Sequence, residues 1–522
     1  MSADRGGRAA TVVGAGILAS RLTGLVRTYL FGHFFGLSME ADAFNAASKI
    51  PNIMRTLLGE GALSASFVPV YSRLLVKGNE RGANALAGAV LGLLMASVSI
   101  LTLVGIAAAP ALTTVLTPHF IGEKRELTIQ LTRILFPMTA LMVLSGWCLG
   151  VQNSHRRFFW SYASAALWNV AQIALLVGWG SRANSMQQLA VWLAWATLLG
   201  SVLQVAAQMP EVLRLVRPLR VSLNRAAQGV AETMRNVVPV VTALGVVQLS
   251  SLIDLQIANF LPDGAISGLN YANIIVQLPV ALFGISVAAS SLPEFSRDSS
   301  VVDHTALLER LRGGWQRILF YIVPSSIACI VYGDLIVGLL LRSGRFGGAE
   351  QRVVHGVLAA FAVGLISFGS VKLLASAHYA LQDYRTPLRA SLVSLAVSAC
   401  ISIAVAWPFR HSVYGAAGIA LGTAVGSYVN LAVQIRGLRA RLGALYTSHM
   451  WQGTRRIATA TGVAAIAAAP IRYFLGADVP LLTAPPTLGV FTLVYLIVAW
   501  RMGSGEAARW LRQPARAGAA VS

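Results

Sequence analysis

Long apolar runs separated by short polar segments dominate this chain from one end to the other. About 20 apolar residues in a helix cross the hydrocarbon core of a bilayer. Soluble proteins carry about 25% charged residues, whereas this chain has 12% charged and 56% hydrophobic residues. Alternation with a period of two is weak, which favours helices over a barrel. The sequence therefore predicts an all-α polytopic membrane protein with about 14 transmembrane helices.

The basic residues predict the orientation of these helices. The expected spans are centred near residues 22, 60, 98, 140, 170, 200, 248, 283, 328, 368, 397, 424, 464 and 495. If the N-terminus is cytoplasmic, the cytoplasmic segments are 1–10, 72–84, 152–160, 211–236, 294–318, 381–390, 435–457 and 501–522. They hold 27 of the 41 Lys and Arg residues. Because basic residues gather in cytoplasmic loops, both termini are expected in the cytoplasm, and the net charge of +21 reflects topology rather than nucleic-acid binding.

Two short echoes indicate an internal repeat. Residues 67-FVPVYSRL-74 resemble 291-SLPEFSRD-298, and 151-VQNSHRRFF-159 resemble 381-LQDYRTPLR-389. Two pseudo-symmetric six-helix lobes fit these offsets, as in many secondary transporters. The alternative is that Arg and Pro simply recur at cytoplasmic helix ends. The predicted division is a six-helix lobe at 1–220, a second at 221–445, and two extra helices with a basic cytoplasmic tail at 446–522.

Four basic residues fall inside the first two spans: Arg21, Arg27, Lys49 and Arg55. A charge at mid-bilayer costs about 2.5–3.5 kcal/mol on insertion scales. Such residues usually face a watery cavity or a partner, although long side chains also snorkel to the interface. Each pair brackets a helix-bending residue, Gly24 or Pro51 in the two cases, which could aim both cations inward. The pattern suits a cavity that binds an anion.

Other polar residues of the spans leave alternatives open. Glu60 could pair with a cavity cation or cap a broken helix. Asp42 could form a gate contact or be a solvated residue of the first helical turn. Asp254 is a candidate for ion coupling or for a salt bridge to the cations, and Lys372 is either its counterpart or a snorkelling residue.

Several classes of site are not indicated. The sequence shows no Walker loop, no zinc-type His/Cys spacing and no nucleophile elbow, so we expect a transporter rather than an enzyme, with no catalytic residues and no metal site. The three cysteines fall in apolar runs and are expected to pack there. His155 and His378 are expected at the surface, near cytoplasmic helix ends.

The first two spans carry a recognisable signature. The runs 20-SRLTGLVRTYLFGHFFG-36 and 41-ADAFNAASKIPNIMRTLLGEGALSASFVPV-70 resemble the N-terminal signature of the MurJ/MviN family of lipid II flippases. That family belongs to the multidrug/oligosaccharidyl-lipid/polysaccharide exporter superfamily. Supporting similarity extends through 131–146, 270–286 and 364–387.

The resemblance implies a function and a site. It implies alternating access in the bacterial inner membrane, with a central cationic cavity that binds the diphosphate-sugar headgroup of lipid II. The family's functional arginines match Arg21, Arg27 and Arg55. Its periplasmic-side aspartate matches Asp42, and the glutamate of its second helix matches Glu60.

The resemblance also marks two departures. In members with a sodium site, ligands come from the seventh, eleventh and twelfth helices, where this chain offers Asp254 and Thr423. The eleventh span, 390–407, has no Asn or Asp, so sodium, a proton or the membrane potential could drive transport, and no cofactor is expected. Some relatives carry an Asp-Arg pair in the eighth helix, where this chain reads Asn273-Ile274, followed by Gln277 in place of a glutamate.

Three other functions compete with lipid II transport. An exporter of another anionic lipid-linked oligosaccharide would use a similar cationic cavity. A cation-coupled drug antiporter should favour acidic residues in the cavity, and a membrane glycosyltransferase would need an exposed acidic motif. The intramembrane arginines argue against the antiporter, and the sequence shows no exposed acidic motif of the kind that the glycosyltransferase would need.

Overall fold

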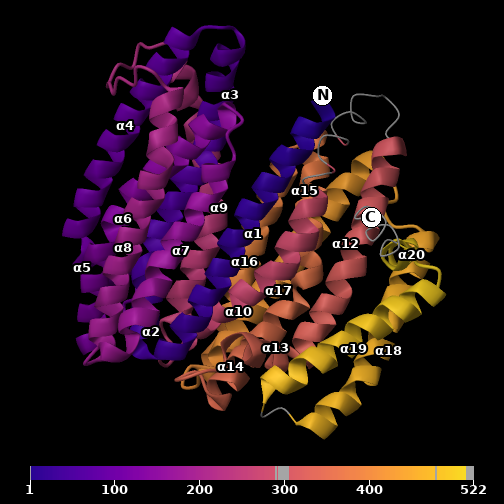
Figure 1. The fold of residues 1–522 in the computed structure, drawn as a ribbon. Helices are drawn as coiled ribbons and strands as arrows, with labels where there is room; N and C mark the ends of the chain where they lie inside the picture. The colour runs from indigo at the N-terminus through magenta and orange to yellow at the C-terminus, as the bar shows by residue number, and fades with distance from the viewer. Residues whose placement is uncertain (1, 289–290, 292–294, 296–304, 477–478, 513–522) are drawn as a thin grey trace, which may run out of the picture. The chain divides into compact units, whose positions relative to one another are not determined.

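A computed structural model describes residues 2–288, 291, 295, 305–476 and 479–512, with side chains except at 2–18, 60, 62, 243, 246, 247, 449 and 509–512. In this described part of the chain, the regular elements are helices (Figure 1). The chain divides into two compact units. The first is Met1–Asn259 with Ser343–Arg345, and the second is Phe260–Arg342 with Phe346–Ser522. The three-part division with a boundary near residue 220 stays a prediction.

The first unit is built around two apolar clusters. Its helices are α1 (Ser2–Phe35), α2 (Met39–Met54), the π-helix η1 (Arg55–Gly61), α3 (Ala62–Val76), α4 (Glu80–Ala107), α5 (Ala109–Leu116), α6 (Gly122–Ser154), α7 (Phe159–Trp179), the short 3-10 helix η2 (Gly180–Arg182), α8 (Met186–Leu215) and α9 (Val230–Ala258). One cluster surrounds Trp147 and Phe67. The other surrounds Phe35 and Leu131.

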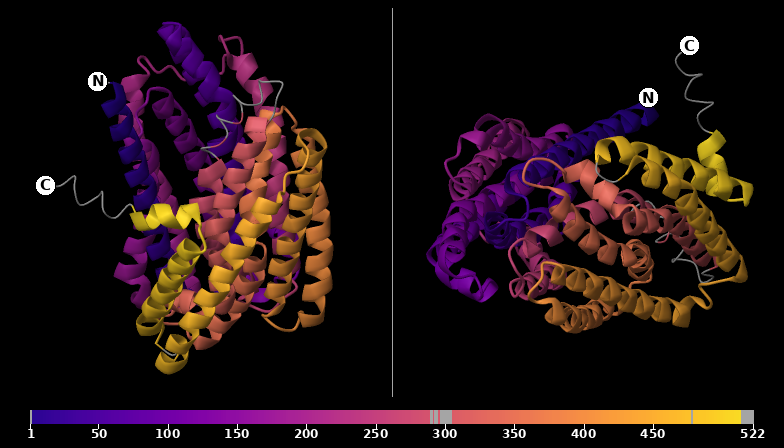
Figure 2. Two further views of the ribbon diagram at one scale, coloured as in Figure 1. Left: turned by 90° about the vertical axis from the view of Figure 1, so that its right-hand side faces the viewer. Right: turned by 90° about the horizontal axis from the view of Figure 1, so that it is seen from below.

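The second unit contains the other helices of the described residues, seen from two further sides in Figure 2. They are α10 (Ala265–Pro279), the π-helix η3 (Val280–Ile285), α12 (Thr305–Val331), α13 (Gly333–Leu341), α14 (Gly348–Val363), α15 (Leu365–Ala380), α16 (Arg385–Ala406), the 3-10 helix η4 (Trp407–Phe409), α17 (Gly415–Leu442), α18 (Ser448–Leu475), α19 (Pro480–Arg501) and α20 (Gly505–Arg512).

A glycine stripe explains the close packing of α16 on α17. Gly418, Gly422 and Gly426 recur every fourth residue of α17, and a Cβ at any of them would clash with α16. Small residues at this spacing let two membrane helices approach closely. The stripe therefore holds α16 and α17 together without a large apolar side chain between them.

The fourteen predicted centres all fall within helices of the structure. By length and composition, ten helices of the described residues are apolar enough to cross a membrane, and the number is eleven if the α14–α15 pair, bent by 41°, is counted as one span. The other three predicted spans correspond to α1, to the α2–η1–α3 run and to α9. The prediction of an all-helical polytopic membrane protein is confirmed.

The π-helices repeat between the two units. Residue 55 begins η1 and residue 280 begins η3. Each contains a glycine that meets a glycine of a neighbouring helix: a Cβ on Gly146 would lie 2.6 Å from the carbonyl oxygen of Gly59, and a Cβ on Gly284 would lie 3.0 Å from the Cα of Gly369. Close backbone packing thus accompanies the change of helical geometry in both places, at offsets of 225 and 223 along the chain.

A second repeated feature corrects one of the sequence echoes. Arg156 follows α6 with φ +58°, and Gln382 follows α15 with φ +57°. In each turn the amide of the next residue donates to the carbonyl five residues earlier, at 2.9 Å. The two turns are therefore related by 226 residues rather than by the 230 of the sequence echo. The other echo, at 291–298, lies mostly outside the described residues.

Candidate functional site

The first pair of cations lies on α1, which packs against α7. The guanidinium carbon of Arg27 lies 4.9 Å from the ring centroid of Trp168. The neighbouring Asn169 donates hydrogen bonds of 3.2–3.3 Å to a hydroxyl and a carbonyl of α1. Arg21 is exposed. The helix continues through Gly24 without interruption, so the two arginines stay on one continuous helix.

The second pair lies at the junction of α2 and η1. Pro51 is buried inside α2, and the helix changes to π geometry only at Arg55. Lys49 and Arg55 are both half-buried. Lys49 interacts electrostatically with Asp254 of α9. Since π-helical turns are often found at functional sites, the break in α-helical geometry falls at the residue that the sequence marks as functional.

Close packing of the π-helix against α6 fixes the position of the backbone that carries Arg55. The closely packed Gly59 and Gly146 bring η1 against α6. A side chain at either glycine would push the two helices apart.

Glu60 lies in η1 by its backbone, but its side chain is outside the described residues, so the choice between an ion pair and a cap stays open.

Asp42 occupies a buried position at the start of α2. Its side chain is only 1% exposed and lies 3.3 Å from the Nζ of Lys124, at the start of α6. Lys124 in turn lies 4.0 Å from the ring centroid of Phe120. The alternative that Asp42 is a solvated residue of the first turn is therefore wrong, because its charge is buried and paired. Its role as a gate stays a prediction.

The second unit presents different chemistry. Asn273 and Gln277 are exposed on one face of α10, where the amide of Gln277 donates to Asn273 across 3.4 Å. Ile274 is half-buried between them. Lys372 is exposed on α15. Among the described residues, no carboxylate oxygen lies within 4 Å of the Lys372 amine.

The residues proposed for ion coupling fit a sodium ion poorly. Asp254 already interacts with the cationic Lys49, which would repel a second cation. Thr423 has a buried hydroxyl with no hydrogen-bond partner among the described groups. The facing helix α16 supplies no carboxylate. Hard cations need several oxygen ligands, so we derive no transport step through sodium.

One buried polar cluster was missed in the sequence. His378 is fully buried, so the expectation that it lies at the surface is wrong. Its ring is 3.1 Å from a carboxylate oxygen of Asp383 and 3.1 Å from the carbonyl of Gln434. Burial alone would raise the pKa of Asp383. Hydrogen bonds from Thr386 and His378 and the charge of Arg441 outweigh it and lower that pKa to about 2.

Comparisons with known proteins agree with this arrangement. A sequence model of the family described as "Lipid II flippase MurJ" matches residues 31–478. The chain is 32% identical to the "Lipid II flippase MurJ" of Burkholderia cenocepacia, over 83% of this chain and 84% of that protein. It is 30% identical to the "Probable lipid II flippase MurJ" of Rhizobium tropici, over 94% and 93%.

Two solved structures share the fold. One is described as "Lipid II flippase MurJ, inward closed conformation"; it superposes with a TM-score of 0.78 at 20% identity and covers 94% of this chain and 98% of its own. The other is an inward-facing multidrug resistance MATE family transporter of the MOP superfamily, with a TM-score of 0.62 at 17% identity, covering 82% and 95%.

Proposed function

The chain belongs to the family of the lipid II flippase MurJ, and from that premise we propose that Arg27 and Arg55, with Lys49 and Arg21, bind the diphosphate of lipid II while the protein carries it between leaflets. The protein is a lipid II flippase, a multi-pass membrane transporter and not an enzyme. Transport runs from the cytoplasmic to the periplasmic leaflet by alternating access.

The observation that carries this proposal is the placement of the cations in the first unit. Arg27 is supported by the ring of Trp168, and Lys49 by the carboxylate of Asp254. Both supports lower the cost of keeping a cation within the membrane.

The chemistry of a diphosphate matches these side chains. Arginine donates through a planar fork that meets two phosphate oxygens at once. A guanidinium that stacks on an aromatic face keeps its N–H donors at its edge, so Trp168 orients Arg27 without competing for the phosphate. Lys49 adds charge, and Asp254 balances it when no substrate is bound. Glu60 and Asp42 complete the proposed set as a cavity acid and a gate residue.

The substrate assignment is tested in cells depleted of this protein. We expect the amount of lipid II accessible at the periplasmic face to fall while total lipid II rises. A normal periplasmic amount after depletion would contradict the function. Restoration by the wild-type chain, at matched membrane abundance, is the control.

The orientation is tested by labelling. With both termini in the cytoplasm, cysteines placed at Asp263 and Gly476 should react with an impermeant thiol reagent added to intact cells, whereas one at Asn224 should not. All three lie in connections between helices. Labelling at Asn224 without labelling at Asp263 would reverse the proposed topology.

A further inference from the structure

We propose that the second unit holds a separate site for the phosphate headgroup of an anionic phospholipid, in a polar pocket where α12, α18, α19 and α20 meet. The pocket has a volume of about 310 Å³, at the lower end for small-molecule sites. It lies entirely within the second unit. It does not depend on the cations of α1 and α2 or on the proposed route of lipid II.

The lining of the pocket suits a phosphate. Arg317 of α12 and Arg456 of α18 both line it, together with the side-chain amides of Gln316 and Gln452. All four side chains donate hydrogen bonds, and arginine binds phosphate oxygens bidentately. Glu506 of α20 is the one acidic residue of the lining, 3.2 Å from the Nε of Arg317. The pocket therefore keeps a net positive charge.

Glycines let the chain close around these donors. Gly503 has φ +79°, a conformation that strains other residues, and it turns the chain from α19 toward α20. A Cβ on Gly503 would lie 3.7 Å from a terminal nitrogen of Arg456. A Cβ on Gly453 would collide with the amide of Gln316. The backbone thus approaches the polar side chains closely, and the pocket retains its space.

The position of the pocket favours a lipid over a soluble anion. Trp451 near the start of α18 and Trp500 near the end of α19 are 56% and 48% exposed. Tryptophans gather at the headgroup level of a membrane. Farther along the same hairpin, Ile466 and Leu493 expose apolar surface suited to acyl chains. The pocket lies at the tryptophan end, where a lipid phosphate would sit.

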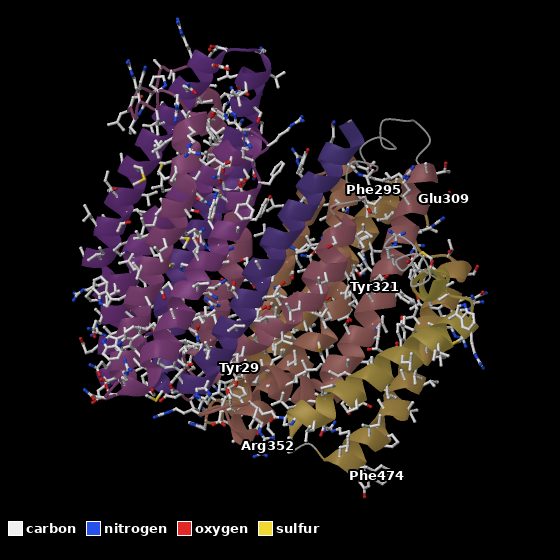
Figure 3. All side chains as sticks on the ribbon, in the orientation of Figure 1. Tyr29, Phe295, Glu309, Tyr321, Arg352 and Phe474 are labelled. Carbon is white, nitrogen blue, oxygen red and sulfur yellow. The ribbon has the colours of Figure 1, made fainter. Side chains whose placement is uncertain are left out.

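The figures show at which end of the second unit the pocket lies. The helices α18 and α19 run side by side (Figures 1 and 2). Within the second unit, Glu309 near the start of α12 and Phe474 near the end of α18 lie at opposite ends (Figure 3). The lining residues lie toward the Glu309 end, since they come from the middle of α12, the first third of α18, the end of α19 and the start of α20.

The basic residues of the sequence predict that the pocket lies at the cytoplasmic leaflet. The lining comes almost wholly from three segments whose basic residues predict a cytoplasmic location: 294–318, 435–457 and 501–522. Anionic lipids of the cytoplasmic leaflet attract such basic segments. These segments are far apart in the sequence, and the fold brings them together around one cavity. A bound headgroup would tie the α18–α19 hairpin to α12.

The test measures lipid binding to the purified full-length chain by native mass spectrometry. The probes are dioleoyl phosphatidylglycerol and, as the neutral comparison, dioleoyl phosphatidylcholine. We expect a preference for phosphatidylglycerol that falls about fivefold for Arg317→Ala and for Arg456→Ala, since one basic group near a membrane surface contributes about that factor. Glu506→Gln should strengthen the preference, because it removes the acid that competes for Arg317.

Arg455→Ala is the matched control, since Arg455 is an exposed neighbour outside the lining and should retain the wild-type preference. Equal binding of the two lipids, or equal losses for Arg455→Ala and Arg456→Ala, would overturn the proposal. So would displacement of phosphatidylglycerol by millimolar inorganic phosphate, which would mark a site for a soluble anion. The gain expected for Glu506→Gln separates a binding effect from a folding defect.

Discussion

The α2–η1 run of the first unit and the α10–η3 run of the second unit share a backbone but differ in chemistry. Both change from α to π geometry at equivalent positions. The first run has Arg55 where the second has Val280, and Lys49 where the second has Ile274. Because η3 forms without these cations, the π-helix does not require them. The comparison is compatible with our proposal that the cations of the first run bind a ligand and are not needed for the π-helix.

The largest difference between the two runs is expected when the charge at position 55 is removed and the side chain at the matching position 280 is shortened. We expect Arg55→Ala to abolish complementation of a flippase-depleted strain, and Arg55→Lys to retain part of it because charge remains without the bidentate fork. Val280→Ala should complement almost normally. All three variants must reach wild-type membrane abundance. Equal effects of Arg55→Ala and Val280→Ala would show that the loss concerns helix packing.

The second prediction concerns the two glycine contacts. A Cβ at position 146 would meet the backbone of Gly59, whereas a Cβ at position 369 meets the side chain of Ile318 at 3.2 Å. Backbone gives way less easily than a side chain. Gly146→Ala should therefore destabilise the protein by about 1–3 kcal/mol and Gly369→Ala by less. Thermal melting in detergent measures the difference, and the reverse order would contradict the packing described for η1.

The third prediction compares the turns after α6 and α15. The second turn carries Asp383 where the first carries Arg157. The pKa of Asp383 is lowered to about 2 from 3.8, so its ionised form stabilises the fold above about pH 4, and this contribution is lost as the pH falls toward 2. Asp383→Asn should cost about 1–3 kcal/mol at neutral pH, and less at pH 3.

Arg157→Ala is the control, because Arg157 is exposed and should change stability little. Melting temperatures of the two variants and the wild type, measured from pH 3 to pH 7, provide the check. If the difference in melting temperature between the wild type and Asp383→Asn grows as the pH falls, the prediction is contradicted.

The smallest effect is expected at position 274. Ile274 is half-buried at the position where the family resemblance implies an arginine in some relatives, and Asn273 and Gln277 beside it are neutral. With the acidic partners replaced as well, an arginine has nothing to pair with. Ile274→Ala should leave complementation nearly intact, and Ile274→Arg alone should not improve it. If Ile274→Ala abolishes transport at normal membrane abundance, position 274 has a role in transport, and this prediction is wrong.

The sequence predicts the helices well, because the length of an apolar run is a local property. It also marks the cations of the first two spans as candidate functional residues, since placing a charge within a bilayer is costly in any fold. The π-helices were missed because they accompany contacts between distant glycines such as Gly59 and Gly146. The burial of Asp42 and His378 was missed for the same reason: Lys124 and Gln434, which satisfy them, lie far away in the chain.

We propose that the cations of the first unit bind the diphosphate of lipid II. The most direct test measures periplasmically accessible lipid II in a strain whose only copy of this protein carries Arg27→Ala and Arg55→Ala. At wild-type membrane abundance of the variant, we expect an amount of accessible lipid II as low as in cells depleted of the protein. A wild-type amount of accessible lipid II in that strain would contradict the claim.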